Sequence, residues 1–167
     1  MTTFQQALKH TLKWEGGSKF TDDPHDPGGA TKYGISKRAH PELDIPNLTY
    51  EQAERVYLEH YWLPLNCEAV SLIAPVLAMK LFDMGVNLGV RRGAKIFQAA
   101  VQTLSPGICV DGYIGPQTLT ALSAVDVHTV RELVQVRLEN YYRSLDNPRF
   151  QQGWLNRAAS WPGLDIA

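Results

Sequence analysis

The stretch from about Ala74 to Leu88 constrains the fold of this chain most, because its residues are apolar on nearly every side of a helix. A helix that is hydrophobic all round lies inside a protein and not on its surface. The apolar run LIAPVLAMKLF is too short to cross a bilayer and includes Lys80, so we expect no membrane insertion. The sequence therefore predicts one buried central helix with other helices packed around it.

Helical periodicity extends through most of the chain. Phe4, Leu8 and Leu12 recur at the spacing of an amphipathic helix, for which Thr2 or Thr3 is the expected N-cap. One further helix is predicted after a capping box at Thr49 and Gln52, and another over an apolar stripe from Val90 to Leu104. Three more are predicted: one that begins at Pro116, a long one that ends at Leu145, and a short one from about Pro148 to Ala159.

Strand signals are weak and confined to one region. Only the segment from about Ser18 to Ile35, rich in glycine and proline, has the composition of a short hairpin. The predicted class is therefore mainly α, with a loop or β-hairpin insertion after the first helix. The length of 167 residues suits one compact domain or two small halves with a shared core, and a functional division near Met79 stays open.

Composition argues against several classes of function. The formal net charge of -1 gives no basic field that would favour nucleic acid as a partner. Cys67 and Cys109 lack metal-ligand spacing, and we expect two buried thiols in a reducing compartment, although one disulfide stays open. The sequence contains no calcium-loop or zinc motif, so no metal or cofactor is expected. The N-terminus lacks a basic cap before an apolar core, so we expect no cleaved export signal.

Glu15 is the first candidate for chemistry. It follows Leu8 and Leu12 on the apolar stripe of the first helix, and Gly16 and Gly17 after it are typical helix terminators. Desolvation and the negative end of a helix dipole both disfavour a carboxylate, so this position favours a protonated acid. Such an acid can protonate the leaving oxygen in glycosidic bond cleavage. The alternative is a surface glutamate beyond the end of the helix.

The loop DDPHDPGGAT that follows offers a second carboxylate. It holds Asp22, Asp23, His25 and Asp26, followed by Thr31, and a carboxylate across a cleft from Glu15 could activate water or stabilise an oxocarbenium-like centre. The alternative is a solvated turn, because aspartate, proline and glycine are common turn formers.

Two further side chains are candidates for sugar binding. Tyr33, inside the same segment, has a ring that can stack on a sugar face. Asn87 continues a polar row with Lys80 and Asp83 on the central helix, and its amide can bond sugar or acetamido groups. That row can equally face solvent or form a buried polar network.

The segment WEGGSKFTDDPHDPGGATKYGIS resembles the signature of the glycoside hydrolase family 108 N-acetylmuramidases, which are lysozyme-type enzymes common among phage endolysins. The match runs from Glu15 through Asp23 to Thr31 and ends at Ile35. The stretches FDMGVNLGVRRGAKIFQAAV and DGYIGPQTLTAL resemble the segment that follows in this family, often described as a predicted peptidoglycan-binding region.

The resemblance implies a lysozyme-like helical fold, with a catalytic region at 1–80 and a peptidoglycan-binding region at 81–167 in one compact unit. It implies hydrolysis of the β-1,4 bond between N-acetylmuramic acid and N-acetylglucosamine, with bacterial glycan strands as the partner and Glu15 as the catalytic acid. The expected further site residues are Asp26 and Thr31 for catalysis, and Asp23, Tyr33 and Asn87 for substrate binding.

Two other functions stay open at this point. One is a non-catalytic wall-binding or phage structural module, and the other is a lytic transglycosylase that uses the same glutamate. For the muramidase, we expect a monomer that is made in the host cytoplasm and released to the cell wall for host-cell lysis.

Overall fold

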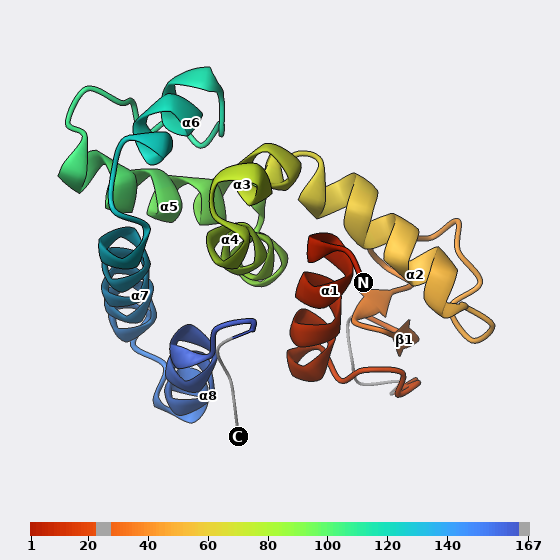
Figure 1. The fold of residues 1–167 in the computed structure, drawn as a ribbon. Coiled ribbons are helices and arrows are strands. Elements are labelled where there is room, and N and C mark those ends of the chain that lie inside the picture. Colours follow the sequence, from red (N-terminus) through yellow and green to blue (C-terminus); the bar gives the residue numbers. More distant parts are fainter. Residues whose placement is uncertain (23–27, 164–167) are drawn as a thin grey trace.

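The computed structural model describes residues 1–22 and 28–163 and is built mainly from α-helices (Figure 1). A small antiparallel hairpin follows the first helix, as the sequence predicts. The described elements are α1 (Thr3–Trp14), β1 (Thr31–Lys32), β2 (Ile35–Ser36), α2 (Tyr50–Tyr57), the π-helix η1 (Leu58–Trp62), α3 (Cys67–Ile73), α4 (Pro75–Leu88), α5 (Val90–Leu104), α6 (Pro116–Ser123), α7 (Val127–Ser144) and α8 (Pro148–Ala159).

Local hydrogen bonds set the beginnings of two helices where the sequence predicts them. The hydroxyl of Thr2 accepts a bond from the backbone N–H of Gln5, whose side chain accepts one from Thr2 in return. Thr49 and Gln52 form the same capping box before α2. Such caps satisfy backbone donors that the first helical turn leaves unpaired. Proline begins α4, α6 and α8, where its missing N–H removes no helical bond.

The segment after α2 differs from the sequence-based expectation. The sequence predicts a helix after the capping box, whereas α2 passes directly into η1, where the N–H of Leu63 donates to the carbonyl of Leu58. Asn66 then adopts a left-handed φ of 51° and leads the chain into α3, a helix too short for periodicity to predict. Its side-chain amide donates to the carbonyl of Ile114 at 3.0 Å, which fastens this turn to the C-terminal half.

Helix α4 is the centre of the fold and packs against α1, α3 and α5 (Figure 1). Every residue over 77–85 is buried, including Lys80 and Asp83. The predicted buried central helix is therefore confirmed. The helix runs unbroken through the boundary between 1–80 and 81–167, and a functional division at that point stays a prediction.

Three aromatic rings join the N-terminal helices to α4. Phe4 on α1, Trp62 at the end of η1 and Phe82 on α4 pack with ring centroids 5.3 to 5.8 Å apart. All three are buried, and buried rings add ring-to-ring attraction to the large apolar area that they remove from water. This cluster fixes the first helix, and with it Glu15, relative to α4.

The two cysteines lie in different environments. Cys67 is buried and burial raises the pKa of its thiol, whereas Cys109 is exposed, so the expectation of two buried thiols is wrong for Cys109. Cys109 lies in the irregular segment between α5 and α6, where it packs in no helix. Both thiols are free.

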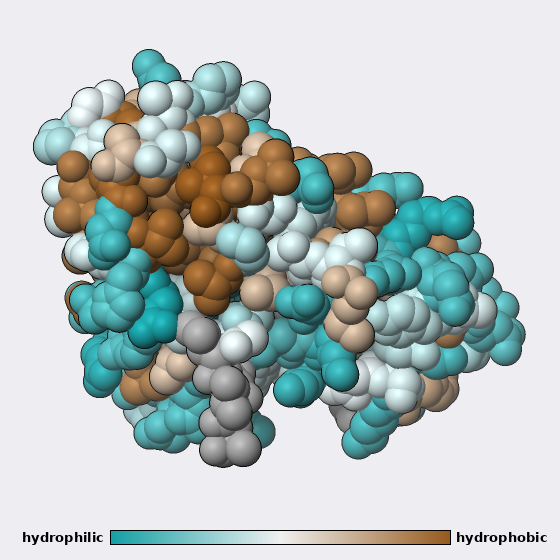
Figure 2. All heavy atoms as spheres, viewed as in Figure 1, coloured by the Kyte–Doolittle hydropathy of each residue, from teal (hydrophilic) through white to brown (hydrophobic). Residues whose placement is uncertain are grey.

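The surface differs in polarity from one part of the molecule to another. On the face shown in Figure 2, apolar residues gather around α5, whereas the surface over α2 is mostly polar. Among the described residues, no helix combines the length and the hydrophobicity that a bilayer-spanning segment needs.

Gly93 of α5 allows a close approach to α4, because a Cβ at this position would lie 3.0 Å from the backbone nitrogen of Gly85. We expect Gly93→Ala to lower the free energy of unfolding by about 1–3 kcal/mol, since backbone atoms cannot move aside as a flexible side chain can. Urea unfolding measures the change. The matched control is Gly153→Ala on α8, where a Cβ meets no atom within 4 Å and alanine favours the helix. Equal effects of the two substitutions would contradict the close approach.

Candidate functional site

Glu15 is the residue at which α1 ends. Its backbone N–H still donates to the carbonyl of Thr11 at 3.2 Å, and the N–H of Gly17 donates to the carbonyl of Leu12 at 2.8 Å. Gly16 and Gly17 have positive φ values of 85° and 60°, which glycine adopts without strain. The Glu15 side chain is 24% exposed and extends from the end of the helix toward its neighbours.

The hairpin β1–β2 presents a tight turn to this helix end. Its strands pair antiparallel with Thr31 opposite Ser36, which leaves Tyr33 and Gly34 as a two-residue turn. Both turn residues have positive φ, 53° at Tyr33 and 74° at Gly34. Positive φ at both positions is what a type I′ hairpin turn requires, because its twist matches that of the strands.

Gly34 of this turn lies directly against Glu15. A Cβ at residue 34 would be 2.8 Å from the Cβ of Glu15 and 2.7 Å from the hydroxyl of Tyr57. That hydroxyl donates to the carbonyl of Tyr33 at 2.8 Å and so ties α2 to the turn. The stem of Glu15 therefore lies close against Gly34 of the hairpin, near the Tyr57 hydroxyl of α2.

The carboxylate of Glu15 binds an arginine from the opposite end of the chain. Nη1 of Arg157, on α8, donates to Oε1 of Glu15 at 2.8 Å. The same guanidinium donates through Nε and Nη2 to Asp83 of α4, at 3.2 and 2.9 Å. Asp83 also accepts a bond from the hydroxyl of Thr11 at 3.1 Å. Side chains of α1, α4 and α8 thus meet in one ionic network, in which the Arg157 side chain is 7% and that of Asp83 is 2% exposed.

Arg157 changes the electrostatics that the sequence predicts for Glu15. Burial lowers the pKa of the Arg157 guanidinium, but the charges of Asp83 and Glu15 more than offset this, so the pKa is raised and the group stays cationic. The Glu15 carboxylate therefore lies against a permanent cation, which the sequence did not predict. Sequence reasoning missed this partner, because no spacing rule links positions 15 and 157.

Two tyrosines border the carboxylate. Burial, followed by the negative charge of Glu15, raises the pKa of Tyr57 and of Tyr61. Both phenols therefore remain neutral hydrogen-bond donors next to the acid.

A small pocket of about 80 Å³ lies beside Glu15. Tyr61 and His40 contribute polar groups to its lining, and Val56 and Val86 contribute apolar ones. A larger hollow of about 720 Å³ runs along α1, but none of the described residues that line it is acidic. The smaller pocket is lined by Glu15 and is the candidate site, because acid catalysis by a carboxyl group needs that group at the reacting atoms.

The structure describes some of the predicted catalytic residues and not others. Asp23 and Asp26 lie outside the described residues. Thr31 lies on β1, and its hydroxyl donates to the carbonyl of Gly29 at 3.1 Å. The position of Glu15 at the helix end is thus described, while its predicted second carboxylate stays a prediction.

Two of the predicted sugar-binding residues, Tyr33 and Asn87, are described, and each has a protein partner. The ring of Tyr33 packs edge-on against Tyr50, with centroids 6.1 Å apart, and the ammonium of Lys32 lies 5.7 Å from its centroid. The carbonyl oxygen of the Asn87 side chain accepts a bond from the hydroxyl of Tyr142 at 2.5 Å. Their roles in substrate binding stay predictions.

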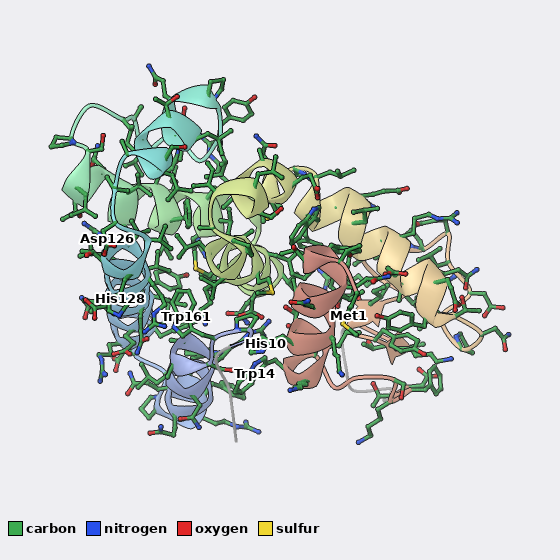
Figure 3. The ribbon with its side chains drawn as sticks, in the orientation of Figure 1. Met1, His10, Trp14, Asp126, His128 and Trp161 are labelled. Carbon is green, nitrogen blue, oxygen red and sulfur yellow. The ribbon has the colours of Figure 1, made fainter. Side chains whose placement is uncertain are left out.

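The polar row on α4 is a buried network at two of its positions. The ammonium of Lys80 donates to the backbone carbonyls of Arg157 and Ser160, at 2.8 and 2.6 Å, and Asp83 binds the Arg157 side chain. His10 of α1 reaches the same segment, with Nε2 3.3 Å from the Ser160 hydroxyl (Figure 3). The end of α8 is therefore anchored to α4 and α1.

Metal binding finds no support within residues 1–22 and 28–163, where no group of three or more histidine, cysteine, aspartate or glutamate side chains could hold an ion.

Two family models match the chain. Glycosyl hydrolase 108 matches residues 8–89, and Predicted Peptidoglycan domain matches residues 92–159. The solved structure of SagA from Brucella abortus is similar, with a TM-score of 0.75 and 26% sequence identity over 94% of this chain and 90% of that chain. No curated protein sequence matches. The first matched region contains Glu15, and the second contains Arg157.

The contact between Gly34 and Glu15 predicts a specific loss of stability. We expect Gly34→Ala to lower the free energy of unfolding by about 1–2 kcal/mol for its left-handed φ, and by a further 1–3 kcal/mol or so for the contacts with Glu15 and Tyr57. Gly16→Ala is the control, because Gly16 has a similar φ of 85° but meets no atom within 4 Å. Chemical unfolding of both variants isolates the second contribution, and an equal loss in both would show that the turn does not press on Glu15.

Proposed function

The chain belongs to the glycosyl hydrolase 108 family and joins this region to a predicted peptidoglycan domain, and from this premise we propose that it is an N-acetylmuramidase. It has a lysozyme-like helical fold and is a glycoside hydrolase that acts on peptidoglycan. The proposed reaction is hydrolysis of the β-1,4 bond between N-acetylmuramic acid and N-acetylglucosamine.

The placement of Glu15 carries the proposal. Its carboxyl lies at a helix end beside a small pocket, and Gly34 and Tyr57 hold its stem in place. The pocket combines the neutral phenol of Tyr61 with apolar walls, a mixture that suits the polar edges and apolar faces of sugars. A fixed carboxyl that is only partly exposed is the arrangement that general acid catalysis of glycosidic cleavage requires.

In the proposed reaction, Glu15 donates its proton to the glycosidic oxygen as the bond from that oxygen to the anomeric carbon breaks. A water molecule adds to this carbon from the opposite face and gives its proton to a second carboxylate, Asp26 or Asp23. Thr31 assists in holding the water, and Tyr33 and Asn87 contact the sugar. We propose inversion at the anomeric carbon, which needs carboxyl groups about 6.5–9.5 Å apart so that water fits between them.

We also propose a biological setting for this activity. The enzyme is made in a host cytoplasm and acts after release to the wall, where cleavage of the glycan strands leads to lysis. It acts as a monomer on the strand.

The Glu15→Gln variant tests the assignment of the acid. The amide keeps the shape of the side chain but has no proton to donate, so lysis of purified sacculi should slow by about 10²–10⁴-fold. Glu132→Gln, at an exposed position on α7, is the control and should retain full activity. A folded Glu15→Gln variant with normal lysis would refute the proposed role.

Product masses distinguish the proposed hydrolase from a lytic transglycosylase that uses the same acid. Hydrolysis adds one water to each cleaved bond, so the fragments should end in reducing sugars. Fragments with anhydro ends, lighter by one water, would show that no water is added and would exclude the hydrolytic mechanism.

The second carboxylate is tested by comparing Asp26→Asn with Asp23→Asn. If Asp26 activates the water, Asp26→Asn should lose activity by about 10²–10⁴-fold, because an amide is not a base. Asp23→Asn should then change mainly substrate affinity, which initial rates over a series of substrate concentrations would reveal. Full activity in both variants would rule out Asp23 and Asp26 as the second carboxylate and refute the proposed mechanism.

A further inference from the structure

Arg157 links two regions that family membership treats separately. It lies on α8, within residues 92–159, yet its guanidinium contacts Glu15 within residues 8–89. The region described as a predicted peptidoglycan domain therefore supplies a side chain to the centre of the glycoside hydrolase region.

The geometry holds the guanidinium in one orientation. Nε and Nη2 face Asp83, so the planar fork is aligned by that carboxylate and Nη1 is directed at Glu15. Lys80 binds the backbone carbonyl of Arg157 at 2.8 Å, which fixes the point from which the side chain extends. The side chain is 7% exposed, so solvent screens its charge only weakly.

The charges of the three side chains suit an acid that must give up its proton. With Glu15 protonated, Arg157 and Asp83 balance each other, and proton transfer leaves Glu15 negative beside the arginine. The cation stabilises that developing charge and so helps the transfer. An arginine without Asp83 would hold Glu15 in the ionised form before reaction, since an opposite charge in contact strongly favours the charged state.

We propose that Arg157 is a positioning residue for Glu15 and that Asp83 sets how strongly the charge of Arg157 acts on Glu15. This inference rests on the role of Glu15 as the general acid. The C-terminal region thus takes part in the reaction as well as in the fold.

Other titratable groups also face Glu15, and they stay constant in the comparison below. They come from several elements: Tyr57 on α2, Tyr61 on η1, Tyr142 on α7, and His40 in the segment after β2. Because these groups are present in every variant, differences between the pH profiles report on the two substituted charges.

The experiment measures kcat and KM for wall hydrolysis over a series of pH values with Arg157→Gln and Asp83→Asn. Arg157→Gln should lower kcat by about 10²-fold, as expected when a reacting group is misplaced by about 1 Å. Without the cation, Glu15 keeps its proton to higher pH, so the alkaline limb of the profile should move up by about 1 pH unit or more. Asp83→Asn should move the same limb down, because the arginine charge is then no longer balanced.

Conservative and matched variants separate positioning from folding. Arg157→Lys keeps the charge but loses the fork, so its alkaline limb should stay below that of Arg157→Gln while kcat falls. The double variant Asp83→Asn/Arg157→Gln removes both buried charges of the pair. It replaces a single variant in the measurement of kcat and the pH profile if that single variant does not fold. Arg149→Gln and Asp146→Asn, both exposed near the start of α8, are controls that should leave kcat and the limb unchanged.

The inference is decided by whether the alkaline limb moves in opposite directions in Arg157→Gln and Asp83→Asn. If activity depends on Glu15 but folded Arg157 and Asp83 variants keep the wild-type limb and kcat, Arg157 is only a structural contact and the inference is overturned. If Glu15→Gln is itself fully active, the proposed function fails, and the positioning role that rests on it fails with it.

Discussion

The guanidinium of Arg157, held between Glu15 and Asp83, is the interaction on which the rest of the site depends. The three side chains of this network come from the end of the first helix, the central helix and the last described helix. The network therefore forms only when these helices are packed together. A buried charge pair adds little stability compared with apolar packing, but it tolerates few alternative arrangements, because removal of one partner leaves a buried charge unpaired. The network therefore defines the position of Glu15 more than it adds to the free energy of folding.

The central helix joins the two matched regions into one structure. α4 lies at the end of the region 8–89, yet it packs against α5 of the region 92–159 along a glycine contact and anchors the end of α8 through Lys80. The second region is thus packed into the first, not attached beside it. Any binding of peptidoglycan by this region would act on the same body that holds the acid.

The sequence predicted local features well and long-range ones poorly. Periodicity, caps and prolines predicted where most of the helices begin and end, because these signals act within one or two turns. The apolar residues of α4 predicted the burial of that helix. The hairpin was predicted from the glycines and prolines between Ser18 and Ile35, and the position of Glu15 at a helix end from the glycines after it. Helix α3, η1 and the exposure of Cys109 were missed, because short elements give no periodic signal and exposure depends on packing elsewhere. Arg157 was missed because its partners are distant in the chain, and the polar row on α4 proved a buried network at Lys80 and Asp83.

The span of the Glu15–Arg157 contact has a consequence for synthesis. Glu15 is synthesised 142 residues before Arg157, which lies on α8. A chain that ends before α8 lacks Arg157, so the ion network is complete only after α8 has been synthesised. The inferred positioning of the acid is thereby delayed until α8 has been made.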